Sequence, residues 1–145
     1  NIREQLQGSI IVSVQAELGE PLNSPLHLTA LAHACINGGA KGVRLAQNRN
    51  IQHFKEQFPH IPVIGITKPE PIPENFKALV YITPTWTEIE EVIEAGAEIV
   101  AIDGTLRPRP NGEQLSDLIA KTQQRYPHIL LMADISTLEE GLNAH

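Results

Sequence analysis

Five short apolar runs, each followed by residues at helical spacing, constrain the fold of this chain more than any other sequence feature. The runs are rich in β-branched residues and only a few residues long, which is typical of strands buried on both faces. They lie at residues 9–15, 42–46, 61–69, 98–103 and 129–134. Strand and helix units that alternate in this way predict an α/β fold with a parallel sheet and right-handed crossovers.

The first helical segments carry start and stop signals. Ser24-Pro25 predicts an N-cap with proline in the first turn, and Gly38-Gly39 predicts the end of that helix. The residues expected on its apolar face are Leu28, Leu31, Ala32 and Cys35. The residues expected on the apolar face of the next helix are Ile51, Phe54 and Phe58.

The second half of the chain adds two capping boxes and an irregular segment. Thr85 with Glu88, and Thr137 with Glu140, have the spacing in which the N-cap and third helical residues satisfy each other's backbone. Prolines at alternate positions exclude a regular helix over residues 69–79. Tyr81-Ile82-Thr83 is predicted as a small extra strand.

The pattern alone is compatible with two architectures, a doubly wound open sheet and a (β/α)8 barrel. A barrel needs eight strand–helix units and typically about 250 residues. The chain has 145 residues, which fits an open sheet better. It would make up roughly five-eighths of a barrel.

One strand end carries a lysine, a residue that can transfer protons. The run at 61–69 ends in Lys68, which lies between turn residues. Parallel strands present their carboxyl ends to the active-site face of α/β folds. A lysine there can act as a proton shuttle if its surroundings lower its pKa toward neutrality. The alternative interpretation is a solvated lysine that closes a strand.

Alternation within the strands points to further polar groups at the same edge. In three strands the bulky aliphatic residues share one face, and small or polar residues occupy the other. The second face ends in Gln15, Arg44 and Asp103, and in a barrel it would line the interior near the catalytic mouth. A polar cluster whose members satisfy one another is the alternative. Lys68 is in phase with the isoleucines of its strand, so alternation leaves its direction open.

Composition argues against several classes of partner and site. A net charge of -6 argues against nucleic acid and anionic membranes. The single cysteine, Cys35, cannot form an internal disulfide, and no signal-peptide pattern or membrane-length apolar run is present, so a cytoplasmic protein is predicted. The six histidines lack metal-ligand spacing and no glycine-rich phosphate loop follows a strand, so neither metal nor cofactor is expected. Residues 107–110 (Arg-Pro-Arg-Pro) are suited to bind an anion or a partner domain. The alternative is a stiff exposed loop that binds nothing.

Five ordered motifs carry a family resemblance that runs nearly the whole length of the chain. They lie at residues 8–25, 63–68, 81–85, 102–110 and 130–137 and include Val-Ile-Gly-Ile-Thr-Lys and Ile-Asp-Gly-Thr-Leu-Arg-Pro-Arg-Pro. In these motifs the chain resembles the bacterial N-acetylmannosamine-6-phosphate 2-epimerases. The resemblance implies a (β/α)8 TIM barrel. Residues 1–145 would then be a single barrel domain, incomplete at the C-terminus, with about the first five β/α units present.

The resemblance also implies an activity. The family interconverts N-acetylmannosamine 6-phosphate and N-acetylglucosamine 6-phosphate in sialic acid breakdown. By resemblance, Lys68 would remove and return the proton on the carbon that bears the acetamido group. Asp134, at the end of the fifth strand, would be a second catalytic residue that positions the sugar or assists proton transfer.

Four more residues match substrate contacts. Arg44 and Gln15 would stabilise the developing enolate, and Asp103 and Thr105 would contact the substrate elsewhere. The implied partner is a phosphorylated amino sugar, with no cofactor and with a homodimer as the assembly.

The chain also departs from the family pattern. Val14, Ala46 and Thr67 stand where cysteine, a polar residue and an aliphatic residue are usual, and the proline-rich loop after Lys68 is longer. The family continues for three more strands, which carry a second acidic catalytic residue and the phosphate-binding loops.

Two other functions fit the sequence. One is a truncated, non-catalytic (β/α) module that binds a sugar phosphate or a partner chain. The other is a different barrel isomerase, or an aldolase that uses Lys68 to form a Schiff base.

Overall fold

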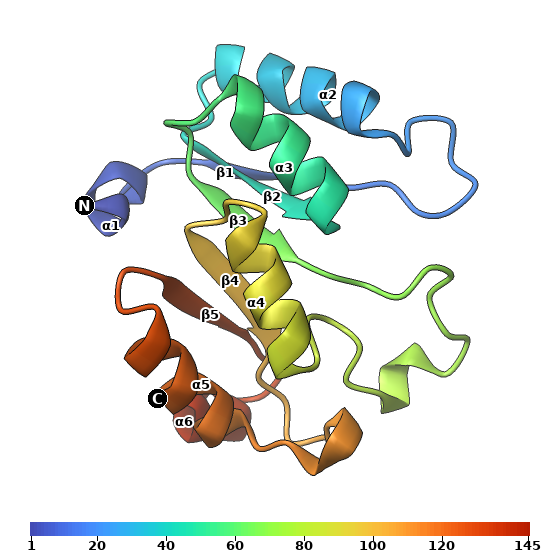
Figure 1. Ribbon diagram of the computed structural model, residues 1–145, viewed down its shortest axis with the longest axis vertical. Helices are drawn as coiled ribbons and strands as arrows, with labels where there is room; N and C mark the ends of the chain where they lie inside the picture. Colours follow the sequence, from blue (N-terminus) through green and yellow to red (C-terminus); the bar gives the residue numbers. More distant parts are fainter.

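The computed structural model describes residues 1–145, and its five strands form one parallel sheet (Figure 1). The strands are β1 (Ile11–Val14), β2 (Gly42–Ala46), β3 (Val63–Ile66), β4 (Ile99–Asp103) and β5 (Leu130–Asp134). The helices are α1 (Ile2–Leu6), α2 (Pro25–Asn37), α3 (Asn48–Gln57), α4 (Trp86–Glu94), α5 (Leu115–Arg125) and α6 (Leu138–Ala144), with short 3-10 turns η1 (Phe76–Ala78) and η2 (Pro110–Gly112). The parallel α/β architecture predicted from the sequence is confirmed.

The strand order decides between the two architectures. In a doubly wound sheet the order reverses at a switch point, so that crossover helices cover both faces. Here the order is β1-β2-β3-β4-β5, so every right-handed crossover returns on the same side. Apolar residues of α2, α3, α4 and α5 accordingly share one core cluster with the strands. This one-sided winding is that of a barrel wall and excludes the doubly wound sheet.

The two faces of the sheet have separate cores, as the alternation predicted. Val43 and Leu45 are buried in the cluster under the helices. Ala46 and Ala101 are buried in a second cluster on the opposite face. The helix-facing layer is therefore built of bulky aliphatic residues and the other layer partly of small ones.

β3 differs from its neighbours because a glycine takes one of its helix-facing positions. Ile64 lies beside Arg44 in the register and Ile66 beside Ala46, so these isoleucines face away from the helices. A Cβ on Gly65 would lie 2.5 Å from a side-chain carbon of α4 and 2.9 Å from one of α3. The close approach of these two helices explains why residue 65 has no side chain, which leaves Val63 as the bulky helix-facing residue of β3.

The sheet is strongly curved, with α2, α3, α4 and α5 on its convex side. On the concave side, the Arg44 guanidinium of β2 donates two hydrogen bonds to the Asp134 carboxylate of β5, at 3.0 and 2.6 Å. In a flat sheet, strands three places apart are separated by roughly 14 Å. An arginine and an aspartate can meet over two intervening strands only where the sheet bends around them.

Several sequence predictions for individual segments were correct. Ser24 caps α2 through its side chain, and the capping boxes at Thr85 and Thr137 open α4 and α6. The proline-rich residues 69–79 contain only the short turn η1.

Others were wrong. Residues 81–83 do not form a strand, because they fill the gap where β3 and β4 separate: the main chain of Thr83 bonds to Thr67 and that of Ile82 to Asp103. Leu31 is 40% exposed rather than part of the core face of α2.

One element had no sequence signal. The helix α1 packs Ile2 and Leu6 against the concave core, and it is too short to show a periodic pattern. None of the helices has the length and apolar character needed to cross a membrane.

The packing at Gly65 predicts the effect of adding one methyl group. We expect Gly65→Ala to lower the free energy of unfolding by about 1–3 kcal/mol, because the Cβ would overlap side chains of α3 and α4. Urea denaturation followed by circular dichroism measures this change.

Gly141→Ala is the matched control. Its Cβ would meet only the flexible end of the half-exposed Ile135, and alanine favours a helix, so stability should rise or stay level. Equal unfolding midpoints for the wild type and Gly65→Ala would contradict the close packing described for β3.

Candidate active site

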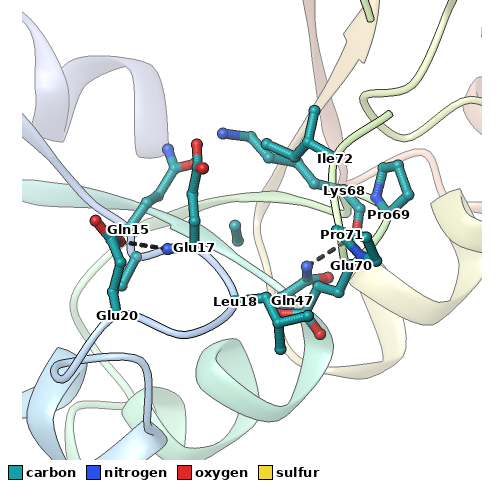
Figure 2. Close-up of a pocket in the computed structure, with 12 residues that line it drawn as sticks. Gln15, Glu17, Leu18, Glu20, Gln47, Lys68, Pro69, Glu70, Pro71 and Ile72 are labelled. Atoms are coloured by element: carbon teal, nitrogen blue, oxygen red, sulfur yellow. Dashed lines mark hydrogen bonds between the residues drawn. The ribbon is translucent and has the colours of Figure 1, made fainter. Parts of the chain in front are cut away.

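A cavity of about 390 Å³ lies at the carboxyl ends of β1, β2 and β3. The polar residues that line it are Gln15, Glu17, Glu20, Gln47, Lys68 and Glu70. They come from the loops that follow the three strands, which the parallel arrangement brings to one edge. Figure 2 shows the Lys68 amine extending from one side of this cavity toward Gln15 and Glu17 on the other.

The surroundings of Lys68 favour its neutral form. Burial lowers the pKa of the Lys68 amine below the ordinary lysine value, and the positive charge of Arg44 lowers this pKa further. The carboxylates of Glu17 and Asp134 act in the opposite direction. Lys68 therefore lies within the electrostatic reach of both members of the Arg44–Asp134 pair. The direction that alternation left open is toward the concave side.

Arg44 and Asp134 form a bidentate ion pair beside the cavity. Their side chains are 21% and 30% exposed, so the pair is partly shielded from water. A fork-like pair of this kind fixes both planar groups in one orientation. Neither Arg44 nor Asp134 is among the residues that line the cavity, but the charges of both act on the Lys68 amine inside it.

The side chain of Gln15 has a hydrogen-bond acceptor that no donor of the protein satisfies. Its amide nitrogen donates to the Ser13 hydroxyl at 2.6 Å, while its Oε1 is buried and has no hydrogen-bond partner. A buried carbonyl oxygen without a partner is unfavourable. A hydroxyl or amide N–H of a ligand in the cavity would satisfy it.

Two of the predicted site residues lie in another cluster. Asp103 is buried and accepts a hydrogen bond from the Thr105 backbone at 2.8 Å. Arg107 donates to the Thr105 hydroxyl at 3.0 Å and to the main-chain oxygen of Lys77 at 2.7 Å. This cluster ties the β4–α5 loop to η1, and neither Asp103 nor Thr105 lines the cavity that contains Lys68.

The main chain around Lys68 is held from two sides. Thr83 is fully buried with φ 43° and exchanges two hydrogen bonds with Thr67, each 3.1 Å long. The Gln47 amide donates to the Lys68 carbonyl oxygen at 2.8 Å. Residues with positive φ that are not glycine are uncommon and cluster at functional sites.

Sequence reasoning missed Glu17, Glu20 and Gln47 as cavity residues. All three are in loops, where no periodicity indicates which way a side chain points. Glu20 accepts a hydrogen bond from the Glu17 backbone, which shapes the β1–α2 loop around the cavity. No group of three or more His, Cys, Asp or Glu side chains is placed to hold a metal ion.

Comparison with known proteins identifies relatives of the chain. Residues 28–145 match a sequence model of the family described as "Putative N-acetylmannosamine-6-phosphate epimerase". Proteins named "Putative N-acetylmannosamine-6-phosphate 2-epimerase" align over almost the entire chain. The one from Listeria welshimeri is 41% identical over 97% of this chain, and the one from Caldanaerobacter subterraneus subsp. tengcongensis is 43% identical over 99%.

A solved structure has the same fold. The N-acetylmannosamine-6-phosphate 2-epimerase from Clostridium perfringens superposes with a TM-score of 0.88 at 38% identity, covering 99% of this chain and 60% of its own. The chain likewise spans 57% and 59% of the lengths of the two curated relatives. Its five strands therefore correspond to part of a TIM barrel, and the chain belongs to the N-acetylmannosamine-6-phosphate epimerase family.

Proposed function

We propose that this chain carries the proton-transfer half of an N-acetylmannosamine-6-phosphate 2-epimerase site. The reaction would interconvert N-acetylmannosamine 6-phosphate and N-acetylglucosamine 6-phosphate. The observation that supports it most directly is the Lys68 amine, which has a lowered pKa and extends into a polar cavity at the carboxyl ends of parallel strands. Membership of the family supplies the substrate class.

Lys68 would act as both base and acid. Its neutral amine would take the proton from the carbon that bears the acetamido group, leaving the C–H electron pair in an enolate and giving an ammonium. Return of that proton to the opposite face of the carbon would invert the centre and regenerate the amine. The burial that lowers the pKa of Lys68 increases the fraction of neutral amine available for the first step.

The neighbouring groups would support the charged intermediate. Arg44 would stabilise the enolate oxygen, and Asp134 would hold the guanidinium in place through its two hydrogen bonds or contact the sugar. The unpartnered Oε1 of Gln15 would accept a hydrogen bond from a substrate hydroxyl or amide. Asp103 and Thr105 would act on the substrate through the β4–α5 loop, because their polar groups are bonded within that loop and to Arg107.

Several properties of the whole protein follow from the family and belong to the same proposal. We propose that residues 1–145 are part of one barrel domain, and that the protein is a cytoplasmic homodimer that acts in sialic acid breakdown. Analytical ultracentrifugation of the intact protein tests the assembly, with a single species of monomer mass contradicting the homodimer.

Removal of the Lys68 amine tests the central assignment. We expect Lys68→Ala to slow exchange of the C2 proton of N-acetylmannosamine 6-phosphate for deuterium by about 10²- to 10⁴-fold, because general acid–base catalysis contributes that much. Proton NMR in D2O measures the exchange directly, with the intact protein.

Lys41→Ala is the control, since Lys41 is exposed and precedes β2 at the opposite end of the sheet. It should exchange at the wild-type rate. Wild-type exchange by Lys68→Ala would rule out the assignment.

The charges around Lys68 predict opposite shifts of its titration. Glu17 raises the pKa of Lys68, so Glu17→Gln should move the rise of exchange rate with pH to lower pH. Arg44 lowers this pKa, so Arg44→Gln should move the same rise to higher pH. The pH–rate profile of deuterium exchange measures both shifts.

Glu74→Gln provides the control, because Glu74 is exposed and is not among the charges that act on Lys68. Shifts in the same direction for Glu17→Gln and Arg44→Gln would mean that the profile reports another group.

A further inference from the structure

The backbone of Gln47, between β2 and α3, adopts a conformation that side chains rarely allow. Its φ is 76° and its ψ is 133°, in the left-handed half of the map where glycine is favoured. Such a residue persists only where its surroundings hold it in place, and these residues concentrate at functional sites. The contacts of Gln47 therefore indicate what this conformation achieves.

The main chain of Gln47 joins two elements. Its N–H donates to the Ile66 carbonyl at the end of β3, at 2.9 Å, and its carbonyl accepts from Asn50 and Ile51 in the first turn of α3, at 3.0 and 3.1 Å. These bonds hold residue 47 at the point where β2 turns into α3. They leave its side chain free to reach the neighbouring loop.

The side chain of Gln47 reaches the main chain of Lys68. β3 ends at Ile66, so the Lys68 carbonyl has no partner from a strand ladder, and the Gln47 amide donates to it at 2.8 Å. Lys68 precedes Pro69, which restricts it to extended conformations. With its carbonyl held and its backbone restricted, the direction of the Lys68 side chain is largely determined.

A second contact holds the residue on the other side of Pro69. The Arg49 guanidinium makes a bidentate pair with Glu70, at 2.9 and 2.6 Å. Hydrogen bonds from Arg49, and more weakly from Gln47, lower the pKa of Glu70. The start of α3 thus binds the loop on both sides of Pro69: Gln47 bonds to Lys68, which precedes the proline, and Arg49 bonds to Glu70, which follows it.

We propose that Gln47 is a positioning residue for Lys68: its amide holds the Lys68 main chain so that the amine stays in the cavity. The unusual backbone at residue 47 is what brings that amide within reach. The inference rests on the proposed role of Lys68 as the proton-transfer group, and its test includes a measurement that does not need turnover.

Two variants separate the hydrogen bond from the backbone conformation. In Gln47→Gly the side-chain amide is removed, and glycine adopts the positive φ without steric strain. The thermal midpoint of this variant should therefore equal or exceed that of the wild type. Gln47→Met keeps the side-chain length and charge but lacks the donor. Gln52→Met is the matched control, because Gln52 is an exposed residue of α3 whose side chain bonds only to Glu56.

The measurement is competitive labelling of lysines with acetic anhydride across a range of pH, read by mass spectrometry on the intact protein. The exposed Lys41 serves as internal reference. In both Gln47 variants we expect the titration of Lys68 to move up toward an ordinary lysine, since a released side chain leaves the burial that lowers its pKa. The kcat for epimerisation should fall by about tenfold to a hundredfold, with a smaller change in KM.

The outcomes distinguish the two proposals. Wild-type Lys68 titration in both Gln47 variants would overturn the positioning role, as would a fall in thermal midpoint for Gln47→Gly with Lys68 titration unchanged. A shifted Lys68 titration in the Gln47 variants, together with a wild-type protein that shows no epimerase activity, would support the positioning role and overturn the proposed function.

Discussion

The ion pair between Arg44 and Asp134 depends on the curvature of the sheet, and the site depends on both. The two residues lie on strands separated by two others, and they meet because the sheet bends around the concave side. The pair also sets the charge near Lys68, since the two partners act on its pKa in opposite directions. Without Asp134, the Arg44 charge would be opposed at Lys68 by Glu17 alone, and the ammonium form of the lysine would be less favoured.

Much of the fold could be predicted because its signals are local. The β-branched runs and the capping boxes at Thr85 and Thr137 marked strands and helix starts, and these depend on neighbours in sequence. Strand order is not local, so the pattern left open whether the sheet winds on one side or both. The sequence of residues 81–83 is typical of a strand, but in the structure these residues fill the gap where β3 and β4 separate. Only the tertiary structure defines that role.

The site was predicted in part for the same reason. Gln15, Lys68 and Asp134 end or follow strands, so a parallel sheet brings them to one edge, and Arg44 reaches Asp134 from within β2. The direction of Lys68 could not be read from alternation, because Gly65 has no side chain to complete the helix-facing pattern of β3. Glu17 and Gln47 lie in loops, where geometry is set by hydrogen bonds such as that from Gln47 to the Lys68 carbonyl.

The paired hydrogen bonds between Thr67 and Thr83 have a consequence for how such a protein can change. They join the two ends of the segment between Thr67 and Thr83. The position of Lys68, next to Thr67, therefore does not depend on the length of that segment. Doubling the length of a closed loop adds only about 0.6 kcal/mol of closure entropy. A change of length within residues 71–81 would therefore reshape the rim of the cavity at little cost in closure entropy, while Lys68 keeps its position.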